Sequence, residues 1–311
     1  YALGSLVSNV GTWMMTTAQS WLVLELTGDG TAVGITIALQ LLPTVFFSPL
    51  GGVLADRCAK DAVLRATQVA MAVPAAVLGV LAVTGVVVQW HVYALAFGFG
   101  IGRALEAPAR HTLVPELVGT ERLANAVALN SASFNLGRLV GPSLAGLGIA
   151  ASGPGPAGPG WVMLGNAASY AASYLALQLL DRPRLRPAAR LARGRGAGRD
   201  ALHYLRGQPR LLLVFGCVFF VGGFGMNFQI TSALMAQVEF GHGAAEFGVL
   251  GSLLACGSIV GALLVARRRG APGLRLICGA SLGLAGVTVL SGLMPTFALY
   301  AATLPLAGAA F

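Results

Sequence analysis

The stretch AVGITIALQLLPTVFFSPLGGVL, residues 32–54, contains no charged side chain and is followed directly by Ala55-Asp56-Arg57. An α-helix rises about 1.5 Å per residue, so a run of this length reaches across the roughly 30 Å hydrocarbon core of a bilayer. In that core every backbone polar group needs a partner within the protein, which a helix supplies by itself. The stretch therefore predicts a transmembrane helix that ends at a charged turn.

The composition of the whole chain agrees with this interpretation. Hydrophobic residues make up 56% of the 311 positions, charged residues make up 10%, and the mean hydropathy is +0.77. A soluble domain carries about 25% charged residues, because its surface has to be hydrated. A chain this poor in charge is expected to face lipid, and a large soluble core is the weaker interpretation.

Similar apolar runs recur along the chain with short breaks between them. Runs long enough to span lie at about 3–26, 32–54, 63–88, 91–109, 123–151, 161–180, 210–238, 244–266 and 273–293, and a tenth begins near 296. No signal peptide is visible and neither end looks natural, so we expect a fragment that is truncated at both ends. The predicted fold is an all-α membrane bundle of about nine full transmembrane helices plus part of a tenth.

The basic residues fall on one side of the predicted helices. If the first helix runs outward, the basic residues gather in and beside the inner breaks, at 55–62, 110–122, 181–209 and 267–272, and the outer breaks contain no Lys or Arg. Cytoplasmic loops of membrane proteins carry such an excess of basic residues. We therefore expect a multi-pass protein of a bacterial inner membrane with these breaks in the cytoplasm. The net charge of +9 is then a topology signal, and no nucleic-acid partner is expected.

One inner break differs from the rest, because residues 181–209 form a long polar linker that is rich in Arg, Pro and Gly. We predict a six-helix N-terminal half at 1–180, a basic cytoplasmic linker at 181–209 and an incomplete C-terminal half at 210–311. A weak internal echo favours two pseudo-symmetric halves. The second span leaves the membrane through Asp56-Arg57, and the eighth span leaves it through Arg267-Arg268.

The turn after the second span carries a first motif, GVLADRCAK, which begins at Gly52. It resembles the loop signature of the major facilitator superfamily, in which Gly, three residues, Asp, Arg, a spacer, Gly and basic residues follow in order. Ala59 replaces the second Gly of that signature. The resemblance implies that Asp56 and Arg57, with Lys60, form a latch between the two halves on the cytoplasmic side. Ordinary basic decoration of a cytoplasmic turn is the alternative.

The fifth span carries a second motif, GRLVGPSLAG, which begins at Gly137. It resembles the signature of the antiporters of the same superfamily through Gly137, Gly141, Pro142 and Gly146, with Ala145 as the one departure. Glycines let a neighbouring helix approach closely, and a proline removes one backbone hydrogen bond and bends the helix. The resemblance implies an exporter, and plain close packing of helices is the alternative.

The segments Pro108–Pro115 and Leu123–Ala126 look like the branch that contains the enterobactin and macrolide exporters. This resemblance implies alternating access, with one cavity near mid-membrane between the halves. It also implies export of a small, partly hydrophobic drug, siderophore or metabolite by proton antiport. The implied partners are the lipid bilayer, the substrate and protons, and the protein is expected to be a monomer. An importer or uniporter of the same fold, and a membrane sensor or scaffold, stay open as alternatives.

Charged side chains inside predicted spans are expensive in lipid and therefore mark candidate sites. Arg103 and Glu106 are three residues apart and share a helix face. The resemblance suggests Arg103 for a proton relay, and Glu106 is the candidate titrating carboxylate, with a static ion pair as the alternative. Arg138 falls near mid-membrane and is a candidate for an anionic group of the substrate, or else a structural partner. Glu25 is a candidate second proton site, or else an interfacial carboxylate.

Polar and aromatic side chains of the first and seventh spans complete the candidate cavity: Asn9, Trp13, Thr17, Gln19, Asn227 and Gln229. The sequence contains no catalytic motif and no phosphate-binding loop. Its cysteines and histidines show no metal-ligand spacing. We therefore expect neither an enzyme nor a metal or cofactor site.

Overall fold

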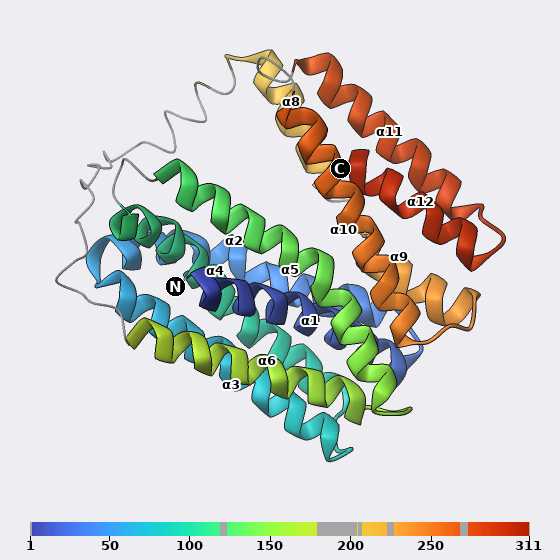
Figure 1. Ribbon diagram of the computed structural model, residues 1–311, viewed down its shortest axis with the longest axis horizontal. Coiled ribbons are helices and arrows are strands. Elements are labelled where there is room, and N and C mark those ends of the chain that lie inside the picture. Colours follow the sequence, from blue (N-terminus) through green and yellow to red (C-terminus); the bar gives the residue numbers. More distant parts are fainter. Residues whose placement is uncertain are drawn as a thin grey trace. The chain divides into compact units, whose positions relative to one another are not determined.

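The computed structural model of the chain describes residues 2–118, 123–178, 204, 207–222, 227–267 and 273–310. All regular structure in these ranges is helical, which confirms the predicted all-α fold class (Figure 1). The elements in chain order are α1 (Ala2–Thr27), α2 (Gly30–Arg57), α3 (Lys60–Val83), α4 (Gln89–Val118), α5 (Leu123–Ala151), α6 (Ala157–Gln178), α8 (Pro209–Phe220), α9 (Phe228–Leu234), a π-helical segment (Met235–Glu239), α10 (Ala244–Ala266), α11 (Leu274–Gly292) and α12 (Phe297–Ala310).

Four of the described helices are long and apolar enough to cross a membrane by length and composition: Gly30–Leu54, Lys60–Val83, Ala244–Val265 and Leu274–Gly292. Among the others, α1 has a comparable length of 26 residues but carries polar side chains. Several of these, among them Asn9, Thr17 and Gln19, are buried against neighbouring helices. Membrane helices tolerate polar side chains where these face other helices and bond to them.

The seventh predicted span, 210–238, is not one regular α-helix. The structure describes α8, a π-helical stretch at 221–222, α9 and the π-helical segment Met235–Glu239, with 223–226 outside the described residues. The stretch holds Gly216 and Gly222, and glycine is the weakest helix former apart from proline. π-helical turns insert an extra residue into a helix and often occur at functional sites. The sequence pattern gave the extent of this segment but not its interruption.

The chain divides into two compact units. The first comprises Tyr1–Ala188 together with Ser232–Ser252, and the second comprises Ala189–Thr231 together with Leu253–Phe311. Helix α10 therefore contributes its first part to one unit and its second part to the other. The division into halves at 1–180 and 210–311 stays a prediction, and almost all of the linker 181–209 lies outside the described residues.

Within the first unit, α2 packs on α4, α3 packs on both α4 and α6, and α1 packs on α5 and α6. The α3–α6 contact depends on two facing glycines. A Cβ atom at Gly160 would lie 2.8 Å from the carbonyl oxygen of Gly79, and a Cβ at Gly79 would lie 2.9 Å from that of Gly160. Because real Cβ contacts are longer than this, the two backbones approach as closely as they do only with glycine at both positions.

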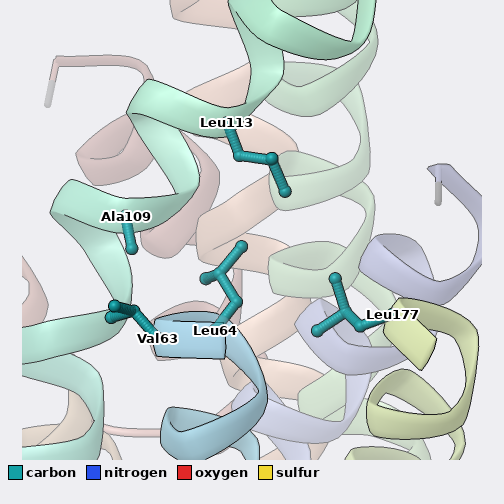
Figure 2. Close-up of a cluster of buried hydrophobic side chains, with 5 residues drawn as sticks. All are labelled: Val63, Leu64, Ala109, Leu113 and Leu177. Atoms are coloured by element: carbon teal, nitrogen blue, oxygen red, sulfur yellow. The ribbon is translucent and has the colours of Figure 1, made fainter. Parts of the chain in front are cut away.

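A group of five buried side chains, the apolar cluster, lies where α3, α4 and α6 meet: Val63, Leu64, Ala109, Leu113 and Leu177 (Figure 2). They come from the start of α3, the second half of α4 and the end of α6, so the cluster lies toward one end of these helices. Buried apolar side chains thus pack α3, α4 and α6 together near the turn between α2 and α3.

Within the second unit, α11 packs on α12 and α8 contacts α11. The hydroxyls of Ser291 and Thr303 are 2.6 Å apart and join α11 to α12 by a buried hydrogen bond. Such a bond satisfies two polar groups that would otherwise be stranded in an apolar environment.

Candidate functional site

The centre of the candidate site is a carboxylate on α4, Glu106, which forms an ion pair with Arg110 one turn further along the helix. Residues four apart share a helix face, which brings the two side chains together. Their side chains are only 14% and 16% exposed, so the pair is largely buried. Arg103, the partner that the sequence suggested, forms no ion pair with Glu106 among the described contacts. The sequence located the carboxylate but not its partner.

Two further helices reach this ion pair. On α1, the side-chain oxygen of Asn9 accepts a hydrogen bond from Nη1 of Arg110 at 3.1 Å. On α3, Nε2 of Gln68 donates to Oε1 of Glu106 at 3.4 Å. We call these four residues the polar network. Sequence reasoning missed Arg110 because the fourth span was taken to end before it, whereas α4 continues to Val118. It also missed Gln68, whose contact with Glu106 depends on how α3 packs on α4.

A small cavity of about 20 Å³ adjoins the polar network and is lined by Gly4, Ser5, Ser8, Leu64, Gln68, Glu106, Arg110, Ser173, Ala176 and Leu177. This volume is about what one water molecule needs. Two buried polar atoms of the network have no partner, namely Oε1 of Gln68 and Nδ2 of Asn9. Buried polar atoms are normally satisfied by protein or by ordered water, so the cavity is suited to a water.

The predicted cavity residues of α1 lie in different surroundings. The guanidinium carbon of Arg138 lies 5.8 Å from the centre of the Trp13 ring, and that ring meets Phe134 edge-on at 5.7 Å. A cation over an aromatic face is attracted by the ring quadrupole. The structure therefore brings together Arg138 and Trp13, which the sequence named separately.

Thr17 and Gln19 are each 1% exposed. The hydroxyl of Thr17 donates to the carbonyl of Trp13 at 3.0 Å, within α1. The side-chain oxygen of Gln19 accepts a hydrogen bond from Nε2 of Gln40 on α2, whereas its own Nε2 is buried without a partner. Both residues are thus used in packing α1, and Gln19 keeps one free donor for a ligand or a water.

The first two glycines of the motif on α5 face α1. A Cβ at Gly137 would lie 2.9 Å from the backbone carbon of Asn9, and a Cβ at Gly141 would lie 2.7 Å from Cβ of Trp13. Neither position has room for a side chain unless one helix moves. These glycines therefore set the distance between α1 and α5, as the close-packing argument from the sequence predicts.

The other half of the same motif faces the first part of α10. A Cβ at Gly146 would lie 3.1 Å from Cα of Gly248, and a Cβ at Gly251 would lie 2.8 Å from Cβ of Pro142. Beside them, the hydroxyls of Ser143 and Ser252 are 2.7 Å apart. Helix α5 therefore has small residues on two faces, and α1 and the first part of α10 each pack closely against one of them.

Glu25 lies near the end of α1 and has a structural partner. Its Oε1 accepts a hydrogen bond from the backbone N–H of Gly155 at 2.8 Å, while its Oε2 is buried without a partner. Gly155 has a φ of +104°, a conformation that favours glycine. Glu25 thus anchors the turn that precedes α6, and its role as a second proton site or as an interfacial carboxylate stays a prediction.

The candidate latch lies where α2 ends at Arg57 and α3 begins at Lys60. The side chains of Asp56 and Arg57 are outside the described part of the structure, so their role stays a prediction. The close approach in this region belongs to the glycine before the motif: a Cβ at Gly51 would lie 3.1 Å from Cα of Leu105. Gly52 itself is half-buried.

The remaining cavity candidates, Asn227 and Gln229, belong to the second unit. The backbone carbonyl of Asn227 accepts hydrogen bonds from the N–H groups of Ile230 and Thr231 at 2.9 and 3.0 Å, and so begins α9. A shared cavity with the residues of α1 stays a prediction. Among the described residues, no group of three His, Cys, Asp or Glu side chains is placed to hold a metal ion.

A family model described as transmembrane secretion effector matches residues 2–311 of the chain. The multidrug efflux pump Tap of Mycolicibacterium fortuitum is 29% identical over 181 residues, which are 57% of this chain and 43% of that protein. The staphyloferrin A transporter of Staphylococcus aureus is 29% identical over 142 residues, 45% of this chain and 36% of that protein. Macrolide efflux protein A of Streptococcus pyogenes is 26% identical over 144 residues, 46% and 36% of the two chains. These matches span less than half the length of each relative.

Solved transporter structures share the fold. The nucleoside transporter NupG superposes with a TM-score of 0.71 at 15% identity, covering 100% of this chain and 78% of that one. The xylose transporter XylE from E. coli superposes in an inward-open conformation with a TM-score of 0.69 at 15% identity, covering 100% and 80%. Identities this low speak for the fold alone. The family match, by contrast, spans nearly the entire sequence, and the chain belongs to the transmembrane secretion effector family of the major facilitator superfamily.

Proposed function

We propose that the protein exports a small, partly hydrophobic molecule across the bacterial cytoplasmic membrane, by proton antiport with alternating access. Family membership and the efflux names of two relatives, a macrolide efflux protein and a multidrug efflux pump, support export. The motif on α5 supports antiport, because its residues resemble the antiporter signature and separate two helix contacts.

The observation that carries the proton coupling is the buried Glu106–Arg110 pair. A charged side chain at the centre of a membrane helix costs about 2.5–3.5 kcal/mol on the mildest scale. A carboxylate that can take up and release a proton gives such a pair a use, because protonation removes one of the two charges. Transporters commonly place proton-carrying carboxylates at such buried positions.

The moving element in this proposal is α5. Its glycines at positions 137 and 141 permit close contact with α1, and Gly146 permits close contact with the start of α10. Contacts made by backbone and small side chains let one helix rock or slide on another with little repacking. The proposed substrate position is beside Arg138 and Trp13, where α5 meets α1. Asn227 and Gln229 stay separate candidates for substrate contact. The latch at Asp56 and Arg57 closes the cytoplasmic side.

Reconstitution of the full-length protein in proteoliposomes tests this function. Vesicles with an acidic lumen are mixed with ethidium, with a macrolide or with a ferric siderophore. Proton exit should drive uptake of at least one probe in either orientation of the protein, and a protonophore should abolish it. Glu106→Gln should remove the gradient-driven uptake, because a glutamine cannot carry a proton. Uptake of equal size without a gradient would refute antiport and favour a uniporter of the same fold.

A further inference from the structure

The side chain of Arg110 contacts acceptors on two helices at the same time, one on its own helix and one on α1. Its Nη2 forms the ion pair with Glu106 on α4, and its Nη1 donates to Oδ1 of Asn9 on α1. A guanidinium group presents its donors in a rigid plane, so one side chain can hold two acceptors without changing its shape. Arg110 is therefore the residue that connects the carboxylate to α1.

The cavity beside this pair has the properties of a hydration site. It has the volume of about one water, and Ser5, Ser8 and Ser173 bring hydroxyl-bearing residues to its wall. Gln68 is 3% exposed and lines the cavity, with Oε1 unpartnered while its Nε2 donates to Glu106. A water that donates to Oε1 of Gln68 and to the Glu106 carboxylate would satisfy this stranded acceptor.

The apolar cluster closes one side of this cavity. Leu64 and Leu177 are members of the cluster (Figure 2). The same two residues line the cavity. Along α4, Ala109 of the cluster lies between Glu106 and Arg110 and Leu113 follows them, so the cluster and the polar network lie side by side.

Among the described residues, the charged group in contact with Glu106 is Arg110. On α3, Arg65 pairs with Asp61 at 3.2 Å. On α6, Tyr170 is fully buried, and its hydroxyl forms a hydrogen bond with that of Thr12 at 2.9 Å. On α1, the acidic residue is Glu25, at the far end. The other charged residues on neighbouring helices are Lys60 on α3, Arg138 on α5, and Asp56 and Arg57 on α2. The side chains of Asp56 and Arg57 lie outside the described part of the structure.

We propose that Arg110 is the positioning residue of the proton site: it holds the Glu106 carboxylate against α1 through Asn9, with one water bound between Glu106 and Gln68. The inference rests on the proposed proton coupling. When Glu106 takes up a proton, the pair changes from net neutral to a single positive charge on Arg110. The guanidinium then keeps its bond to Asn9, while the neutral carboxyl is free to turn to the water. No other bond is formed or broken in this step.

Infrared spectroscopy of the full-length protein in lipid, titrated with pH, tests the inference without any substrate. The carboxyl C=O band that is absent from Glu106→Gln reports the protonation of Glu106. In Arg110→Gln the midpoint of this band should differ from that of wild type by about one pH unit or more, at least a tenfold change in proton affinity, because the carboxylate has lost its charged partner. Arg65→Gln breaks the matched pair on α3 and should leave the midpoint unchanged.

The remaining variants keep the test decisive. Arg110→Lys retains the charge and should return the midpoint to within about one unit of wild type. In Gln68→Leu, an isotope-sensitive water band that changes together with the Glu106 band in wild type should be lost. Identical midpoints in wild type, Arg110→Gln and Arg65→Gln would overturn the role of Arg110. A water band that persists in Gln68→Leu would overturn the hydration site.

The two proposals fail in different ways. If Glu106 titrates and depends on Arg110, but the proteoliposomes transport without a gradient, proton antiport is refuted and the local chemistry of Arg110 stands. If transport is gradient-driven and lost in Glu106→Gln, but the midpoint of the Glu106 band is the same in wild type and Arg110→Gln, proton antiport stands. The positioning role of Arg110 is then refuted.

Discussion

The contact between α1 and α5 can be tested by adding one methyl group at Gly141. In Gly141→Ala the new Cβ would lie 2.7 Å from Cβ of Trp13 and 3.0 Å from the backbone oxygen of Val10. Neither atom is the end of a flexible side chain, so one helix has to move by several tenths of an ångström. Overpacking of this kind costs about 1–3 kcal/mol. Alanine also gains about 1 kcal/mol over glycine in a helix, so a control must carry the same gain.

Gly165→Ala provides that control, because Gly165 is a glycine of α6 whose added Cβ would have no atom within 4 Å. The gain in helix stability from glycine to alanine is then common to both variants. The difference between their melting temperatures therefore measures the steric overlap of the new Cβ with α1. At roughly 2–4 °C per kcal/mol, Gly141→Ala should unfold about 2–12 °C below Gly165→Ala. Thermal unfolding followed by tryptophan fluorescence in detergent measures this difference. Equal melting temperatures would show that α1 and α5 are not in the contact described here.

Two further substitutions test the packing around the site. Leu113→Ala should destabilise the protein by about 2–5 kcal/mol, because the side chain is fully buried in the apolar cluster. Leu136→Ala, at an exposed position of α5, should change the stability far less. The same melting experiment compares the two variants. Trp13 and Arg138 should show a coupling of about 0.5–2 kcal/mol in a double-mutant cycle of Trp13→Leu with Arg138→Met, and additive effects within error would contradict a cation–π contact.

The fold was accessible from the sequence because the bilayer imposes strong and simple conditions. Apolar runs of sufficient length give the helices, and α2, α3, α10 and α11 are found at the positions that hydropathy predicts. Hydropathy does not describe irregular backbone, and the π-helical segments around α9 were therefore missed. A local composition rich in glycine was the signal that could have suggested them.

The site was less accessible, because partners on different helices leave no spacing in the sequence. Glu106 was identified by its cost in lipid, but its ion pair with Arg110 was hidden by the boundary assigned to the fourth span. The spacing of four residues was a usable signal once the helix was extended. The contacts of Asn9 and Gln68 with this pair depend on how α1 and α3 pack on α4, which no local pattern shows.

The two features that the sequence named separately, the glycine motif of α5 and the carboxylate of α4, meet at Asn9. Its side chain accepts a hydrogen bond from Arg110, and its backbone lies against the position where a Cβ of Gly137 would be, at 2.9 Å. Packed interfaces rearrange in discrete steps, because a close contact leaves no slack for small adjustments. Asn9 therefore contacts both the helix that is proposed to move in transport and the ion pair that is proposed to carry the proton. In this proposal a movement of α5 at Gly137 takes place directly against the residue that supplies an acceptor to Arg110.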